Sequence, residues 1–123
     1  MAEKSSFRLV FGNSPFIRVL DFLLDTRGFY DYSLTEIADK SGVSWATMNK
    51  IYPQLLNLGI IKQTRTISRA KMFLLNEKHP LVKELMIIDN FLSEFFMEIE
   101  LAKQEGKKPQ LPKMTIEPMT IRA

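Results

Sequence analysis

Residues 33–75 constrain the fold most, because they hold the start and stop signals of two short helices in immediate succession. The sequence SLTE has the spacing of a capping box, in which the Ser33 hydroxyl accepts from the backbone NH of Glu36. The Glu36 carboxylate in turn accepts from the backbone NH of Ser33. Gly42 suits the left-handed turn that ends the first helix, and Ser44 can cap the second. These signals predict a helix, a tight turn and a second helix.

A β-hairpin is predicted after the second helix. Two short segments, Ile60–Gln63 and Met72–Leu75, have the composition of strands, although no Asn-Gly or Gly-Gly pair marks the turn between them. In the preceding helix, apolar residues recur at helical spacing and predict the side that is buried. These inward residues are Met48, Ile51, Tyr52 and Leu55.

Positive charge is concentrated in one part of the chain, although the net charge of the whole chain is only +3. Residues 1–43 carry a net charge of −1, residues 44–75 +5, residues 76–105 −4 and residues 106–123 +3. The second segment has no Asp or Glu, and its basic residues are Lys50, Lys62, Arg65, Arg69 and Lys71. Such segregation creates a local positive field that the total charge conceals. A helix-turn-helix that continues into a basic hairpin predicts contact with a phosphate backbone.

The flanking segments complete the predicted organisation. Ser14 followed by Pro15 is a helix start, and a broad apolar helical face extends from there to Leu24. The segment before it has apolar residues from Phe7 to Phe11 that suit either a short strand or a docking arm. We therefore divide the chain into an N-terminal arm (1–13), the helix-turn-helix and hairpin domain (14–75), a long helix (76–106) and a flexible, proline-containing tail (107–123).

The longest predicted helix opens at His79-Pro80 and stops at Gly106. Its apolar residues alternate in steps of four and three, which is the spacing of a coiled-coil seam. We expect its first part to close the domain's own core and its later part, from Leu92, to pair mostly with a second copy. The alternative is a helix that packs only within its own chain. The predicted dimer interface consists of Leu85, Ile88, Leu92, Phe95, Phe96 and Ile99.

Several classes of function lack the residues they would need. The chain has no cysteine, which removes disulfides, thiolate zinc sites and cysteine nucleophiles. His79 is the only histidine, so no metal site is expected. No nucleophile–base pattern and no glycine-rich phosphate loop occurs, so we expect neither an enzyme nor a cofactor. No apolar run is long enough to span a bilayer or to serve as a signal peptide, so we expect a cytoplasmic protein.

The segment LTEIADKSGVSWATMNKIYPQLLNLGII resembles the winged helix-turn-helix of small transcriptional regulators of the MarR-like and ArsR-like types. It looks closest to compact archaeal regulators of that class, and the resemblance covers roughly residues 14–75. The matching positions are Leu34, Ile37, Ala38, Gly42, Val43, Ser44, Thr47, Ile51, Leu55, Gly59 and Ile60. The resemblance implies a mainly α fold with a small β-hairpin, namely a winged helix-turn-helix domain followed by a long C-terminal dimerisation helix.

The resemblance also implies a role for each exposed residue type. The helix that starts at Ser44 would be the recognition helix, which enters the major groove. Its outward residues would be Ser44, Trp45, Ala46, Thr47, Asn49 and Lys50. Asn49 could pair with adenine, and Lys50 could reach guanine or phosphate. The basic residues of the hairpin, or wing, would contact the backbone or the minor groove: Lys62, Arg65, Arg69 and Lys71. The implied function is sequence-selective binding of double-stranded DNA by a homodimeric transcriptional regulator.

Other interpretations stay open at this point. Trp45 could pack in the core or a dimer instead of facing DNA, since tryptophan is usually well buried. The exposed apolar residues Trp45, Leu56 and Leu58 favour a winged-helix protein-interaction module of a transcription, partition or replication assembly, whereas the basic wing opposes it. A DNA-organising protein encoded by a plasmid or virus is a third interpretation. Nothing in the sequence indicates whether a small-molecule effector binds.

Overall fold

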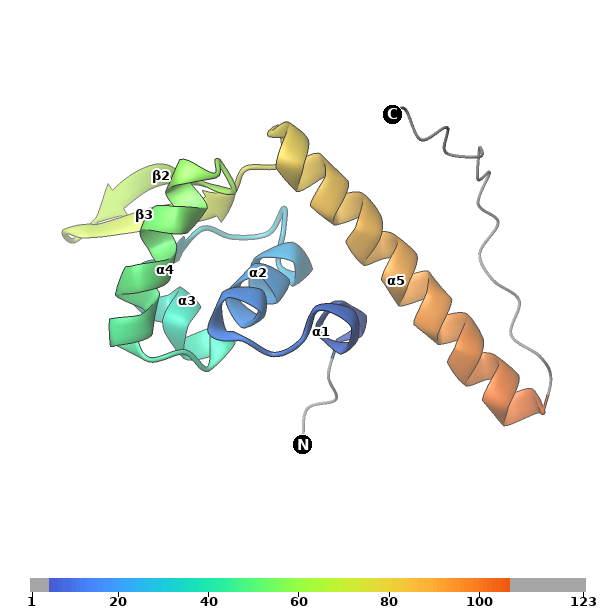
Figure 1. The fold of residues 1–123 in the computed structure, drawn as a ribbon. Coiled ribbons are helices and arrows are strands. Elements are labelled where there is room, and N and C mark those ends of the chain that lie inside the picture. Colours follow the sequence, from blue (N-terminus) through green and yellow to red (C-terminus); the bar gives the residue numbers. More distant parts are fainter. Residues whose placement is uncertain (1–4, 107–123) are drawn as a thin grey trace, which may run out of the picture.

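The computed structural model describes residues 5–106, which form five helices and a small sheet, with the fourth helix beside the sheet and the fifth along the opposite side of the molecule (Figure 1). In chain order these elements are α1 (Ser6–Phe11), α2 (Pro15–Asp25), β1 (Tyr32–Ser33), α3 (Leu34–Ser41), α4 (Trp45–Asn57), β2 (Ile61–Ile67), β3 (Ala70–Leu75) and α5 (Pro80–Glu105). The predicted tail, 107–123, lies outside the described residues.

Serine caps define where the first four helices begin. Ser5, Ser14, Ser33 and Ser44 each accept a hydrogen bond from the backbone NH three residues later, which satisfies one of the free NH groups of a helix N-terminus. The predicted capping box is confirmed, because the backbone NH of Ser33 also donates to the Glu36 carboxylate at 3.1 Å. Gly42 ends α3 at φ 68° and ψ 36°, in the left-handed region as predicted.

The sheet has three antiparallel strands in the order β1-β3-β2. The predicted hairpin is confirmed, but its strands are longer than predicted and meet at a two-residue turn, Ser68-Arg69. Both turn residues have positive φ, 46° and 70°, which is the geometry of a type I′ turn. The sequence did not indicate this turn, because such turns usually carry Asn-Gly. Strand β1 was not predicted either, since two residues are too few for a strand pattern.

The core is formed by α2, α3 and α4 together with β3, and Phe7 of α1 and Val82 and Leu92 of α5 close it. Three of the predicted inward residues of α4, Met48, Ile51 and Leu55, are buried, and the fourth, Tyr52, packs against the core. Residues 6–11 form a helix, so of the two alternatives for this segment the short strand is wrong. The physical reason is the Ser5 cap, whose hydroxyl accepts from the backbone NH of Arg8 and starts a helical turn.

Helix α5 packs against α1 and α2, on the side of the molecule away from α4 (Figure 1). Leu85, Leu92 and Phe96 face this chain's own core. Leu92 is only 7% exposed in the single chain, so the prediction that it mostly faces a partner is wrong. The apolar stripe of α5 is wide enough to serve two surfaces, and Leu92 lies on the inner one.

A second apolar stripe runs along α5 beside the inner one. Leu81, Ile88 and Phe95 repeat every seven residues and therefore share a face of the helix, and Ile99, seven residues after Leu92, lies at the border between this face and the inner stripe. None of these four residues belongs to the core cluster. Ile88 is 36% exposed and Leu81 38%. Among the helices of residues 5–106, none combines the length and apolar character that crossing a membrane requires.

Candidate nucleic-acid interface

Helix α4 separates its buried and exposed residues cleanly. Its inner side packs on the core, and the Tyr52 ring lies 6.4 Å from the Phe73 ring of the sheet. On the opposite side, Ala46, Asn49 and Lys50 are exposed, in agreement with the predicted outward set. The helix therefore presents one small, one amide and one cationic side chain to whatever lies beyond the domain.

The first turn of α4 is stiffened by its own cap. The Ser44 hydroxyl accepts from the backbone NH of Thr47 at 3.2 Å and donates to the Thr47 hydroxyl at 2.9 Å. Thr47 is half-buried, whereas Ser44 is exposed. Both hydroxyls thus have a partner within the helix, so the groups that remain at this N-terminus are its backbone NH groups.

Trp45 is half-exposed, at 52%, and so it is not a core residue. It borders a shallow hollow of about 420 Å³ between α3 and the start of α4, which Thr35, Ala38, Asp39 and Val43 also line. The other exposed apolar residues of this region, Leu56 and Leu58, lie at the far end of α4. Along the helix axis Leu56 is about 16 Å and Leu58 about 20 Å from Trp45, so they form no continuous apolar patch with it.

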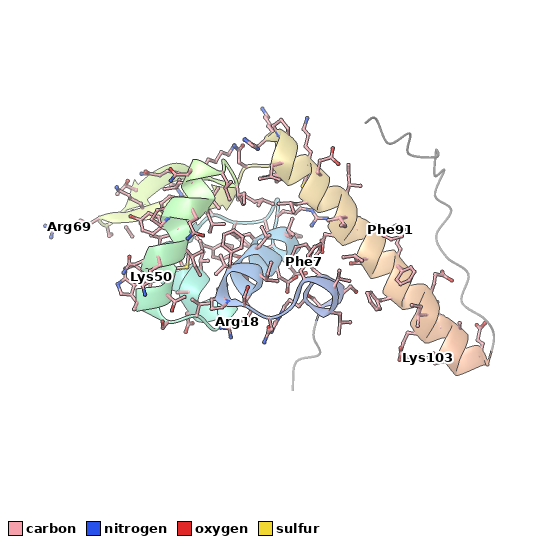
Figure 2. The ribbon with its side chains drawn as sticks, in the orientation of Figure 1. Phe7, Arg18, Lys50, Arg69, Phe91 and Lys103 are labelled. Atoms are coloured by element: carbon pink, nitrogen blue, oxygen red, sulfur yellow. The ribbon has the colours of Figure 1, made fainter. Side chains whose placement is uncertain are left out.

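The wing, which comprises β2 and β3, carries cations along its length and at its tip. Lys62, Arg69 and Lys71 are exposed, and in the part of the chain that is described none of them forms an ion pair. Figure 2 shows Arg69 projecting from the tip, with Lys50 on α4 on the same side of the molecule, away from α5. The structure thus brings a polar helix face and a basic hairpin to one side of the domain.

Arg65 is the exception among the basic residues of the wing. Its Nε and Nη2 atoms donate to the two carboxylate oxygens of Asp31, each at 2.9 Å. A bulge in β2 at Thr64 turns that residue toward the same carboxylate, and its hydroxyl donates to Asp31 at 2.6 Å. The hydrogen bonds from Arg65 and then Thr64 lower the pKa of Asp31 to about 2, so the ion pair is intact at neutral pH.

The acid-free sequence of residues 44–75 therefore does not produce an acid-free surface. Asp31 immediately precedes β1, and β1 pairs with β3 on the side opposite β2. The strand order of the sheet brings the Asp31 carboxylate to the wing, although Asp31 and Arg65 are more than thirty residues apart in sequence. No pattern local to the wing could have predicted that contact.

Sequence reasoning also missed a basic cluster on another part of the domain. Arg8, Arg18 and Lys40 come from α1, α2 and α3 and line one cleft of about 180 Å³. They escaped notice because residues 1–43 have a net charge of −1, and only the packing of the three helices brings these cations together.

His79 has a structural role. Its Nδ1 atom accepts from the backbone NH of Leu81 at 3.2 Å and caps α5. Its ring also lies against Gly59, where an added Cβ would come within 2.5 Å of it. Within residues 5–106 there is no group of three His, Cys, Asp or Glu residues that could hold a metal ion.

Comparison with known proteins establishes the fold. No protein-family model and no curated protein matches the sequence. A MarR family transcriptional regulator from Silicibacter pomeroyi DSS-3 has a similar structure, with a TM-score of 0.50 and 21% sequence identity. The similarity covers 72% of this chain and 62% of that one. The prediction of a winged helix-turn-helix domain followed by a long C-terminal helix is thereby confirmed, whereas the resemblance to an archaeal type stays a prediction.

Proposed function

We propose that this protein is a homodimeric transcriptional regulator that binds double-stranded DNA with sequence preference. One observation carries the proposal: the exposed polar face of α4 and the unpaired cations of the wing lie on the same side of the domain, away from α5. A helix fits the major groove, and an adjacent basic hairpin can then follow the phosphate backbone.

Within this proposal, α4 determines which DNA sequence is preferred, and the wing provides most of the affinity for DNA of any sequence. Asn49 can form two hydrogen bonds with an adenine, Lys50 can reach guanine or phosphate, and Ala46 can contact a thymine methyl group. The wing neutralises phosphates through Lys62, Arg69 and Lys71. These contacts strengthen binding to all DNA sequences similarly, because every sequence has the same backbone. Arg65 acts differently, because its bond to Asp31 braces the wing against β1 and leaves it less free to contact DNA.

The outer stripe of α5 is the proposed dimer interface. Leu81, Ile88, Phe95 and Ile99 all lie outside this chain's core cluster. The first three repeat every seven residues, as one position of a two-helix seam does. Helix α5 has 26 residues and extends beyond the α1 end of the domain (Figure 1), which leaves its later turns accessible to a second copy. A two-fold dimer would place two copies of α4 about 34 Å apart, one turn of DNA, and so favour an inverted repeat.

Selection of DNA from a random pool, followed by fluorescence anisotropy over a salt series, tests the proposal. We expect the logarithm of the association constant to fall linearly with the logarithm of salt, with a slope of about −0.9 for each neutralised phosphate. The selected sequences should contain two related half-sites in inverted orientation. An affinity that does not change with salt would contradict DNA binding, and a pool without enrichment would contradict sequence preference.

A protein-interaction module is the second candidate, and the half-exposed Trp45 beside its hollow favours it. Trp45 is the only tryptophan of the chain, so the intrinsic tryptophan emission reports on this position alone. If α4 enters the groove, duplex DNA should change that emission in proportion to binding. Binding of DNA with unchanged emission would place Trp45 outside the interface and leave its surface to a protein partner.

A further inference from the structure

The cleft between α1, α2 and α3 contains polar atoms that have no partner. It is lined by Arg8, Arg18, Lys40 and Ser41, and we refer to it as the Arg18 cleft. The Nε atom of Arg18 and the hydroxyl of Ser41 are both buried without a hydrogen-bond partner among the described residues. Ser41 is only 9% exposed. Buried polar groups nearly always have partners in native proteins, so these two groups are positions where water or a polar ligand atom can bind.

The Arg18 cleft lies beside the start of α4. The Nη1 atom of Arg18 is 3.8 Å from the position that a Cβ of Gly42 would occupy. Gly42 is two residues before Ser44, the N-cap of α4. In Figure 2, Arg18 lies at the lower edge of the domain, and Lys50 lies between it and Arg69. The cleft and the wing therefore flank α4 from opposite ends, since β2 follows the other end of that helix.

We propose that the Arg18 cleft holds a backbone phosphate of the duplex that α4 enters. This inference rests on the proposed DNA binding and extends it from one side of the recognition helix to both. The guanidinium of Arg18 and the ammonium of Lys40 supply charge. The Ser41 hydroxyl and Arg18 Nε, which are covered in the free protein, become hydrogen-bond donors to the phosphate once the side chains that line the cleft move apart.

Two carboxylates also line the cleft, and their placement leaves room for an anion. Asp21 already accepts a hydrogen bond from the Ser5 hydroxyl at 2.8 Å, and it lies beside Arg8. Asp25 is seven residues after Arg18 on α2, or about 10 Å further along the helix axis, away from the Gly42 turn. Asp25 is thus remote from the end of the cleft next to α4, and in total three cations and two carboxylates line the cleft.

The decisive experiment measures the salt dependence of DNA binding for wild-type protein, for Arg18→Gln and for Lys103→Gln. Both variants lose one positive charge, but Lys103 lies near the far end of α5. For Arg18→Gln we expect the slope to become shallower by about 0.9, one phosphate, with affinity about tenfold lower for every sequence at low salt. For Lys103→Gln we expect no change. Asp25→Asn should raise the affinity, since it removes a carboxylate from the cleft.

Ser41→Ala separates a binding role from a structural one. If the hydroxyl serves only the fold, removing it leaves DNA affinity unchanged. If it bonds a phosphate, affinity falls about threefold while the melting temperature stays the same or rises, because a buried unpaired hydroxyl has been removed.

Three outcomes overturn the inference. Equal slopes for Arg18→Gln and Lys103→Gln, with DNA binding by the wild type intact, refute the cleft and leave the proposed function standing. The second outcome combines two results: inorganic phosphate raises the melting temperature of the wild type but not of Arg18→Gln, and Arg18→Gln leaves DNA affinity unchanged. These results would assign the cleft to a free anion. A wild-type protein that shows no salt-dependent binding of DNA refutes both proposals together.

Discussion

Helices α4 and α5 both pack one apolar face against the domain, but they differ in the side chains that they expose to solvent. Each buries one apolar stripe against the domain, with Met48 and Leu55 on α4 and Val82 and Leu92 on α5. Beyond that stripe, the middle of α4 exposes Asn49 and Lys50, with Trp45 and Leu56 exposed towards its two ends, whereas α5 exposes a second apolar stripe that contains Ile88. Burial on one side makes each segment a helix of this domain, and the chemistry of the other side indicates the kind of partner it meets.

The largest expected effects come from the buried stripes. Met48→Ala on α4 and Leu92→Ala on α5 should each lower the free energy of unfolding by about 2–5 kcal/mol, because each leaves a cavity in a packed core. Denaturation in urea measures this, with Asn49→Ala as an exposed control that should change stability by about 0.5 kcal/mol or less. A small effect of Leu92→Ala would mean that α5 buries no stripe of its own.

Next in size is the loss of the dimer when charge is placed on the outer stripe of α5. Ile88→Glu combined with Phe95→Glu should halve the sedimenting mass, since two buried carboxylates would face their copies across the seam. Helix content by circular dichroism should stay the same, because neither residue belongs to the core. The matched control is Ile87→Glu with Met97→Glu, two exposed apolar residues of α5 away from the stripe, and it should remain dimeric.

Substitutions on the DNA-facing side should divide into two kinds. Arg69→Gln with Lys71→Gln should weaken every sequence and reduce the salt slope by about 1.8, whereas Asn49→Ala should relax preference at one base pair by about 1–3 kcal/mol. Arg65→Gln should reduce the slope less than Arg69→Gln does, because Arg65 is paired with Asp31. If all these substitutions changed affinity and sequence preference equally, the separate roles proposed for α4 and the wing would be wrong.

The smallest expected effect is a loss of stability at acidic pH. The folded pKa of Asp31, about 2, lies below its ordinary value of 3.8, so the ion pair with Arg65 contributes stability above about pH 4. That contribution declines as the pH falls through 2. The difference in unfolding free energy between wild type and Asp31→Asn should therefore be constant from pH 5 to 8 and shrink between pH 4 and 2. A difference that persists at pH 2 would mean that the carboxylate acts through packing.

Local signals predicted much of this fold, and contacts between distant segments account for what they missed. The capping box at Ser33, the turn at Gly42 and the stop at Gly106 depend on neighbours in sequence, and all three appear where predicted. The burial of Leu92 in this chain's own core was not predicted, because the core-facing stripe and the outer stripe of α5 are adjacent and together give the steps of four and three in the sequence. The pairing of Arg65 with Asp31 was missed for a different reason, since it requires knowing that β1 joins the sheet.

The tip of the wing places two demands on the same two residues. Ser68 and Arg69 both adopt positive φ, a conformation that Gly and Asn adopt at lower cost than other residues. A laboratory selection for thermal stability alone should therefore drift toward Asn-Gly at 68–69, whereas a selection for DNA binding should retain arginine there. The sequence at this tip would then record which of the two pressures the protein has experienced.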